Sequence, residues 1–107
     1  MLYELRIYHM HEGRMPAIHR RFADVTLDLF TKHNMKVVDF WEDAEGDNRI
    51  YYVMEHPDMA ARTKHFAAFA NDPEWIKAKE ASEADGPIVE KVEAFFMNRV
   101  PYSPAAD

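Results

Sequence analysis

The chain has 107 residues, enough for one domain with one modest core and too few for two. Hydrophobic residues make up 48% of it, which is too apolar for a disordered chain, and the net charge of -6 argues against binding to nucleic-acid phosphates. The lack of cysteine excludes disulfides, thiolate-bound metals and thiol nucleophiles. No apolar run reaches the roughly 20 residues of a membrane helix, and the first residues do not resemble a signal peptide. We expect a cytoplasmic protein with neither nucleic acid nor membrane as a partner.

The first predicted element is a strand over residues 2–11. Because side chains alternate along a strand, one face carries Tyr3, Leu5, Ile7 and His9, and the other carries Leu2, Glu4, Arg6, Tyr8 and Met10. We expect helices to cover the first, more apolar face. The second face is polar enough to line a wet cavity.

A helix is predicted next, from about residue 15 to residue 33. Apolar residues recur there at helical steps of three and four, at Met15, Ile18, Phe22, Val25 and Leu29. Two strands follow, over residues 36–42 and 49–56, and the short turn between them contains glycine. This pattern predicts an antiparallel hairpin.

The second half of the chain contains two cap signals in close succession. Asp58 can cap a helix that runs to about Ala70, and Asp72 followed by Pro73 can start a second, shorter helix. A last strand is predicted over residues 89–98, followed by an extended, proline-containing tail over residues 100–107. The order is β-α-β-β-α-β with the second helix broken. It predicts a single α+β domain over residues 1–107, with a ferredoxin-like four-stranded antiparallel sheet and helices on one face.

The supply of aromatic residues and methionine suggests self-association. The chain holds two Trp, five Tyr, seven Phe and seven Met, more than so small a domain can bury by itself. The uncovered face of the sheet would expose Tyr8, Phe40 or Trp41, Phe95 or Phe96, and methionines. Two sheets packed face to face would bury this patch and leave one pocket per subunit. We expect a homodimer, or a higher oligomer built from it.

Four segments resemble the NIPSNAP family, in the family's order and across nearly the whole chain. They are Tyr3-Glu4-Leu5-Arg6-Ile7-Tyr8, the segment from His33 to Trp41, Asn71-Asp72-Pro73-Glu74-Trp75, and Val100-Pro101-Tyr102-Ser103-Pro104. The resemblance implies the dimeric α+β barrel superfamily, and therefore a ferredoxin-like fold and a homodimer. It implies no single activity, since the superfamily includes cofactor-free monooxygenases, haem-binding and haem-degrading enzymes, isomerases and stress-related binding proteins.

The strongest candidates for chemistry are Glu4, Arg6 and Tyr8, which share one strand face. Arg6 could hold an anionic group while Glu4 or Tyr8 transfers a proton. The alternative is a purely structural ion pair, within the sheet or between subunits. Phe40, Trp41 and Phe95 are the expected aromatic walls of a ligand pocket, together with Arg6 and Tyr8.

The histidines give weaker signals. His9 and His11 beside Glu12 could bind a divalent metal, but a position at a strand end favours plain exposure, and we expect no metal. His56 is either a general base at a pocket mouth or a loop residue. A haem ligand would require a histidine that points into the cavity, and we expect no cofactor.

The sequence therefore supports a homodimer that binds a small apolar or aromatic molecule in a pocket between sheet and helices. Such a protein could be a cofactor-free enzyme of proton transfer or oxygenation. The alternatives are a non-catalytic interaction or stress-response module and, third, a haem-binding protein.

Overall fold

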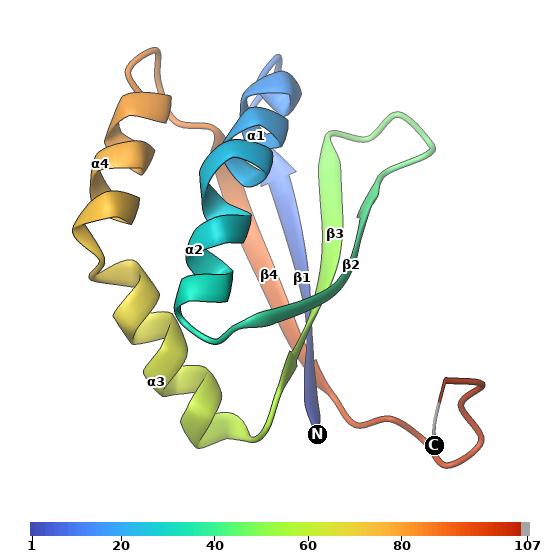
Figure 1. Ribbon diagram of the computed structural model, residues 1–107. Coiled ribbons are helices and arrows are strands. Elements are labelled where there is room, and N and C mark those ends of the chain that lie inside the picture. Colours follow the sequence, from blue (N-terminus) through green and yellow to red (C-terminus); the bar gives the residue numbers. More distant parts are fainter. Residues whose placement is uncertain (106–107) are drawn as a thin grey trace.

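A computed structural model describes residues 1–105, in which strands and helices alternate as predicted (Figure 1). The strands are β1 (Leu2–Met10), β2 (Lys36–Glu42), β3 (Arg49–His56) and β4 (Val89–Met97). The helical segments are α1 (Met15–Arg21), the π-helical turn η1 (Phe22–Thr26), α2 (Leu27–Lys32), α3 (Met59–Ala70) and α4 (Pro73–Ser82). The predicted bounds of the second and third strands are confirmed, and so is the break in the second helix.

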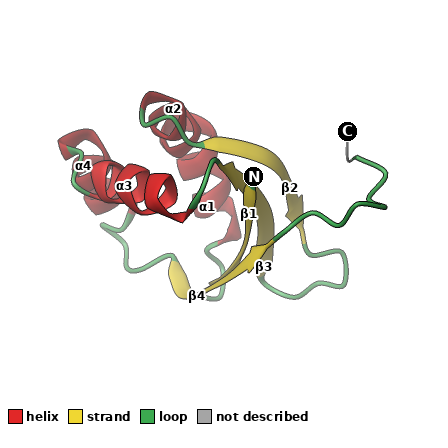
Figure 2. Ribbon diagram, turned by 90° about the horizontal axis from the view of Figure 1, so that it is seen from below, coloured by secondary structure: helices red, strands yellow, loops and turns green. Residues whose placement is uncertain are grey.

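The four strands form one antiparallel sheet in the order β2-β3-β1-β4, which is the ferredoxin-like topology. The helices lie on one face of this sheet, and within residues 1–105 no helix or strand covers the other face, where Arg99 of the tail lies over the Tyr3 ring (Figure 2). The smallest dimension of the molecule, 19 Å, corresponds to one sheet and one layer of helices. The fold class predicted from the sequence is confirmed.

The assignment of the two faces of β1 was wrong. Glu4, Arg6 and Tyr8 pair across the sheet with Met54, Tyr52 and Ile50 of β3, and these three β3 side chains are buried against the helices. Tyr3, Leu5, Ile7 and His9 therefore lie on the open face. Apolar character predicted that the helices would cover the face with Tyr3, Leu5 and Ile7. The helices instead cover the polar face of β1.

Both predicted cap residues are confirmed. The Asp58 side chain accepts a hydrogen bond from the backbone N–H of Ala61 at the start of α3, and Asp72 accepts one from Glu74 at the start of α4. Asp72 also accepts hydrogen bonds from Lys32 and His33, at 2.9 and 2.7 Å. The start of α4 is thereby tied to the end of α2.

The first helical region is one rod with a π turn in its middle. The N–H of Leu27 bonds to the carbonyl of Phe22, five residues back, and the Thr26 hydroxyl donates to the Arg21 carbonyl at 3.1 Å. Apolar spacing alone predicted an uninterrupted helix. Arg21 at the end of α1 and Phe22 and Thr26 within the π turn are buried.

The core lies between the sheet and the helices. Its buried members include Ile18, Phe30, Tyr52, Met54 and Ile88. The predicted tail over 100–107 forms turns as far as residue 105, and its last two positions lie outside the described residues. Within residues 1–105, no helix combines the length and apolar character needed to cross a membrane.

Candidate functional site

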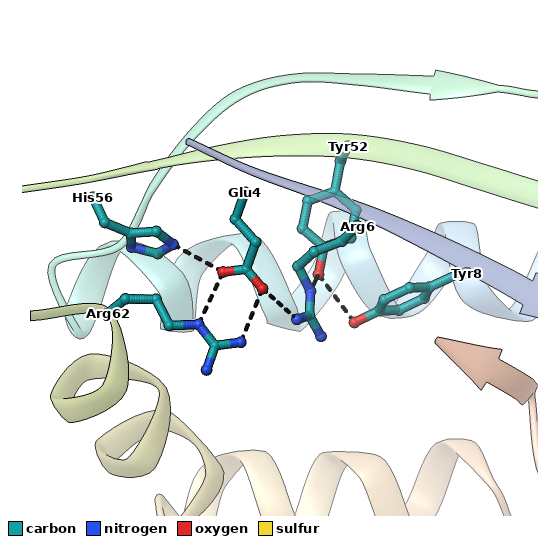
Figure 3. A network of polar contacts seen from close by, with 6 residues as sticks. All are labelled: Glu4, Arg6, Tyr8, Tyr52, His56 and Arg62. Carbon is teal, nitrogen blue, oxygen red and sulfur yellow. Dashed lines mark hydrogen bonds and ion pairs between the residues drawn. The ribbon is translucent and has the colours of Figure 1, made fainter. Parts of the chain in front are cut away.

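A polar network centred on Glu4 lies between the sheet and the helices (Figure 3). The Glu4 carboxylate is fully buried, and Arg62 binds it through two hydrogen bonds, from Nε to Oε1 at 3.0 Å and from Nη2 to Oε2 at 2.9 Å. Arg6 Nη1 donates to Oε2 at 2.9 Å, and His56 Nε2 lies 3.0 Å from Oε1. The carboxylate therefore has partners on both oxygens, as a buried charge requires.

Three elements position this network. Glu4 and Arg6 come from the central strand β1, His56 ends the neighbouring strand β3, and Arg62 stands in the first turns of α3. The turn Pro57-Asp58 and the Asp58 cap direct α3 back across the sheet, so Arg62 reaches Glu4 from the helix layer (Figure 3). The link between Glu4 and Arg62 joins positions 58 residues apart and fixes α3 on the sheet.

The network carries one excess positive charge at neutral pH. Burial by itself would raise the pKa of Glu4, but the hydrogen bonds from Arg62 and Arg6 outweigh it and hold that pKa below 4.5. Burial lowers the pKa of His56 below 6.5, against the opposing effect of Glu4. Glu4 is therefore ionised and His56 is neutral, so the two arginines share one carboxylate.

A second chain of hydrogen bonds runs from Arg6 along the sheet. Arg6 Nε donates to the Tyr52 hydroxyl at 2.7 Å, and the Tyr52 hydroxyl donates to that of Tyr8 at 3.0 Å. Tyr52 is fully buried, and burial is the main cause that raises its pKa well above 10.0. Tyr52 is therefore a neutral phenol, and its hydroxyl proton is available to Tyr8.

The chain of hydrogen bonds ends at a cavity of about 180 Å³ between β1 and the helices. The Arg6 and Tyr8 side chains form part of its wall. Its aromatic lining comes from β1, the first helical region, α3 and α4, namely Tyr8, Phe22, Phe30, Phe66, Phe69 and Trp75. The remaining lining residues are Arg21, Thr26 and Ala70. An apolar hollow with a few polar groups at one place is typical of a small-molecule site.

Arg21 forms a second cationic part of the cavity wall. Its guanidinium lies 5.2 Å from the centre of the Trp75 ring and is largely buried. Its hydrogen bonds to Ser82 and Glu83 are long, at 3.3 and 3.4 Å. Although the whole chain is acidic, the described part of the chain lines the cavity with two arginines and with no acidic residue.

The structure brings together only some of the residues that the sequence predicted for a site. Arg6 and Tyr8 line the cavity. Glu4 does not line it, but is buried next to Arg6 and binds both Arg6 and Arg62. Phe40 stacks on Tyr52 and lines a second hollow of about 320 Å³ beside α1 and η1, with Trp41 at its edge. Phe95 pairs with Leu5 and belongs to the open face, so it lies away from both hollows.

Two of the histidines singled out in the sequence, His9 and His56, each contact a glutamate. His56 is not a loop residue, because it is 1% exposed and bound to Glu4. His9 faces Glu93 across the sheet at 2.6 Å, and among residues 1–105 no group of three acidic or histidine side chains could hold a metal ion.

Several residues of the site were missed in the sequence. Tyr52 could have been found, because Ile50, Tyr52, Met54 and His56 alternate along one strand as a buried set. Arg62 and Arg21 stand among other charged helix residues, and no local pattern singles them out. Only the packing of helices on the sheet shows that they point inward.

The fold and the site together define a class of protein: a ferredoxin-like α+β domain whose helices cover one sheet face and enclose an aromatic-lined cavity there. A sequence model of the NIPSNAP family matches residues 3–104, so the chain belongs to the NIPSNAP family. None of the curated proteins compared with the chain matches it.

Solved structures of the same family share the fold. An uncharacterized NIPSNAP domain protein from Burkholderia xenovorans is 23% identical, with a TM-score of 0.83 over 97% of this chain and 99% of the other. A NIPSNAP family protein from Agrobacterium tumefaciens is 14% identical, with a TM-score of 0.85 over 97% of each chain. A protein described as an antibiotic biosynthesis monooxygenase is 15% identical, with a TM-score of 0.63 over 94% of this chain and 100% of the other. At these identities the comparison concerns the fold.

Proposed function

We propose that this NIPSNAP protein binds a small aromatic molecule in the cavity between β1 and the helices. The observation that carries the proposal is the wall of six aromatic side chains around a hollow of about 180 Å³. That volume is below the usual range of ligand sites, about 300–1,000 Å³, so it suits a single ring better than a fused ring system. The rings supply apolar surface, and Arg6 and Tyr8 supply orientation.

The same arrangement supports cofactor-free chemistry by proton transfer. Tyr8 belongs to the cavity wall, and its hydroxyl is linked through Tyr52 to the guanidinium of Arg6. A hydroxyl held in this way can stabilise negative charge that develops on a bound substrate. Oxygenation of the bound ring is the second reaction that we consider, on the likeness in fold to the monooxygenase alone.

A substitution that fills the cavity tests binding. Ala70 lines the hollow from the end of α3, so Ala70→Leu should abolish binding of a neutral single-ring probe such as benzyl alcohol. We would measure binding by titration followed by amide shifts in NMR. The matched control is Ala68→Leu, on the exposed side of the same helix, which should bind as the natural protein does. Equal binding by both variants, or no binding by the natural protein, would contradict the proposal.

We further propose that the protein forms a homodimer through the open face of the sheet. This face carries Trp41, Phe95 and Met97, which are 50%, 49% and 36% exposed, and half-buried Leu5 and Ile7 beside them. Contiguous apolar surface of this kind is rare on proteins that remain monomeric. A twofold axis lets the same surface cover itself.

The oligomeric state can be tested by placing a charged side chain at one apolar contact of the open face. Phe95→Lys should convert a dimer into a monomer in sedimentation velocity at micromolar concentration, because a charge would be buried at the interface. Ile76→Lys is the matched control, since Ile76 is also 49% exposed but lies on α4, in the helix layer. A monomeric natural protein would refute the proposal.

Two alternative functions and the cytoplasmic location remain predictions. A non-catalytic interaction or stress-response module would use the same dimer but bind no ligand in the cavity. Haem binding would give a visible absorption band in the purified protein. The cytoplasmic location rests on composition alone.

A further inference from the structure

We propose that the ligand of the cavity carries an oxyanion, most simply a carboxylate, and that Arg6 and Tyr8 hold it. This inference rests on the proposed function and adds the chemical class of the ligand, an aromatic acid. It follows from the direction of the hydrogen bonds in the network and from the charge that the network leaves uncompensated.

The direction of the hydrogen bonds is fixed by Arg6. A guanidinium can only donate, so the Tyr52 oxygen accepts from Arg6 Nε. Tyr52 has one proton, and it donates that proton to the Tyr8 oxygen 3.0 Å away. The Tyr8 oxygen is thereby occupied as an acceptor, and its own proton is left for a partner. Since Tyr8 lines the cavity, that partner is a ligand atom that accepts a hydrogen bond.

Arg6, which also lines the cavity, has a further N–H group that can donate a hydrogen bond. Nε binds Tyr52 and Nη1 binds Glu4, while Nη2 has no hydrogen-bond partner within the described residues. The rings of Phe66, Tyr8 and Tyr52 lie within 4.8 to 5.8 Å of the guanidinium carbon and exclude water from much of its surface. The polar end of the cavity therefore offers donors and no free carboxylate oxygen.

The charges favour the same conclusion. Among residues 1–105, Glu4 is the one carboxylate that pairs with Arg6 and Arg62, and His56 is held neutral, so the cluster has an excess of one positive charge. Arg21 adds a second guanidinium to the cavity wall, balanced by Glu83. A charge in a dry site is stabilised by a counter-ion that also satisfies its donors. An oxyanion does both, whereas an amine or an alcohol does not.

The cavity continues toward the surface through a second hollow. This hollow shares Tyr8, Arg21 and Trp75 with it and lies between α4 and β4. Lys79 and Lys91 stand in its wall together with Glu83 and Glu90, so the route itself does not select for charge. The preference for an oxyanion therefore depends on Arg6 and Tyr8 inside the cavity.

The test compares two probes of nearly equal size, benzoate and benzyl alcohol, titrated into the full chain and followed by NMR. We expect benzoate to bind at least about tenfold more tightly, because a hydrogen bond to a charged group contributes more than one to a neutral group. Tyr8→Phe should weaken benzoate about tenfold and leave benzyl alcohol within about twofold. Tyr102→Phe is the control, since Tyr102 is 86% exposed in the tail, and it should change neither affinity.

The outcomes separate this inference from the proposed function. Equal affinities for the two probes, or benzoate affinity unchanged in Tyr8→Phe, would overturn the oxyanion assignment and leave an aromatic pocket in place. Binding of neither probe to the natural protein would overturn both proposals. A thermal melt of each variant shows whether the fold is intact, and Tyr8→Phe keeps the ring that packs on Phe22 and Tyr52.

Discussion

Replacing Glu4 by glutamine should lower the free energy of unfolding by about 3–5 kcal/mol, the usual effect of removing one partner from a buried ion pair. Glutamine has nearly the same shape, so packing is preserved while the charge is lost. Arg6 and Arg62 would then face each other without a counter-ion, and the amide nitrogen would point at a donor. Urea unfolding at a fixed protein concentration measures the change.

The effect of Glu4→Gln should depend on pH in a defined direction. The pKa of Glu4 is lowered from 4.5 in the folded protein, so its charge contributes stability above about pH 4.5. That contribution is lost as the pH falls through the folded-state pKa, and the natural protein and the variant should converge. Glu42→Gln is the control, because its pair with His19 is exposed and should contribute less than about 1 kcal/mol. Similar losses in both variants would show that Glu4 is not the anchor of the site.

Phe30→Ala should have an effect of comparable size, a loss of about 3–5 kcal/mol in the free energy of unfolding. Phe30 is 2% exposed and packs on Phe69, with ring centres 4.9 Å apart, and on Tyr52 and Phe66. Its loss would also enlarge the cavity, because Phe30 forms part of the wall. Chemical denaturation measures the stability, and titration with benzoate reports on the enlarged hollow.

Leu27→Ala provides the matched control for Phe30→Ala. Leu27 lies on the same helix, but it is 37% exposed, and alanine favours the helical conformation. We expect a loss below about 1 kcal/mol. A loss for Phe30→Ala as small as this would mean that the helices are packed more loosely on the sheet than the ring contacts indicate.

The sequence by itself determined the order and the ends of the elements. Alternation over residues 49–56, the cap residues Asp58 and Asp72, and Pro73 in the first turn are local signals. They depend on a residue and its near neighbours, so no tertiary contact is needed to interpret them. The β-α-β-β-α-β order then leaves few topologies, and the ferredoxin-like sheet is the common one.

Only the tertiary structure decided which face of β1 is inside. Two sets of side chains alternate along β1, an apolar set (Tyr3, Leu5 and Ile7) and a polar set (Glu4, Arg6 and Tyr8). From the sequence, the apolar set was the one expected to face the core. The helices cover the second, because Arg62 of α3 and His56 of β3 satisfy the Glu4 carboxylate there. Burial of a charge depends on partners that are distant in sequence, and alternation along one strand cannot reveal them.

The cavity is a product of tertiary structure for the same reason. Arg6 and Tyr8 were identified in the sequence by their shared face, but Arg21 lines the cavity from the end of α1, and Phe66 and Trp75 line it from two other helices. The helical period of a sequence indicates which residues lie on the apolar side of a helix. The way in which the helices cross the sheet decides which of these residues surround a cavity. The sequence thus determined the elements and their order, and packing at long range decided the inner face and the site.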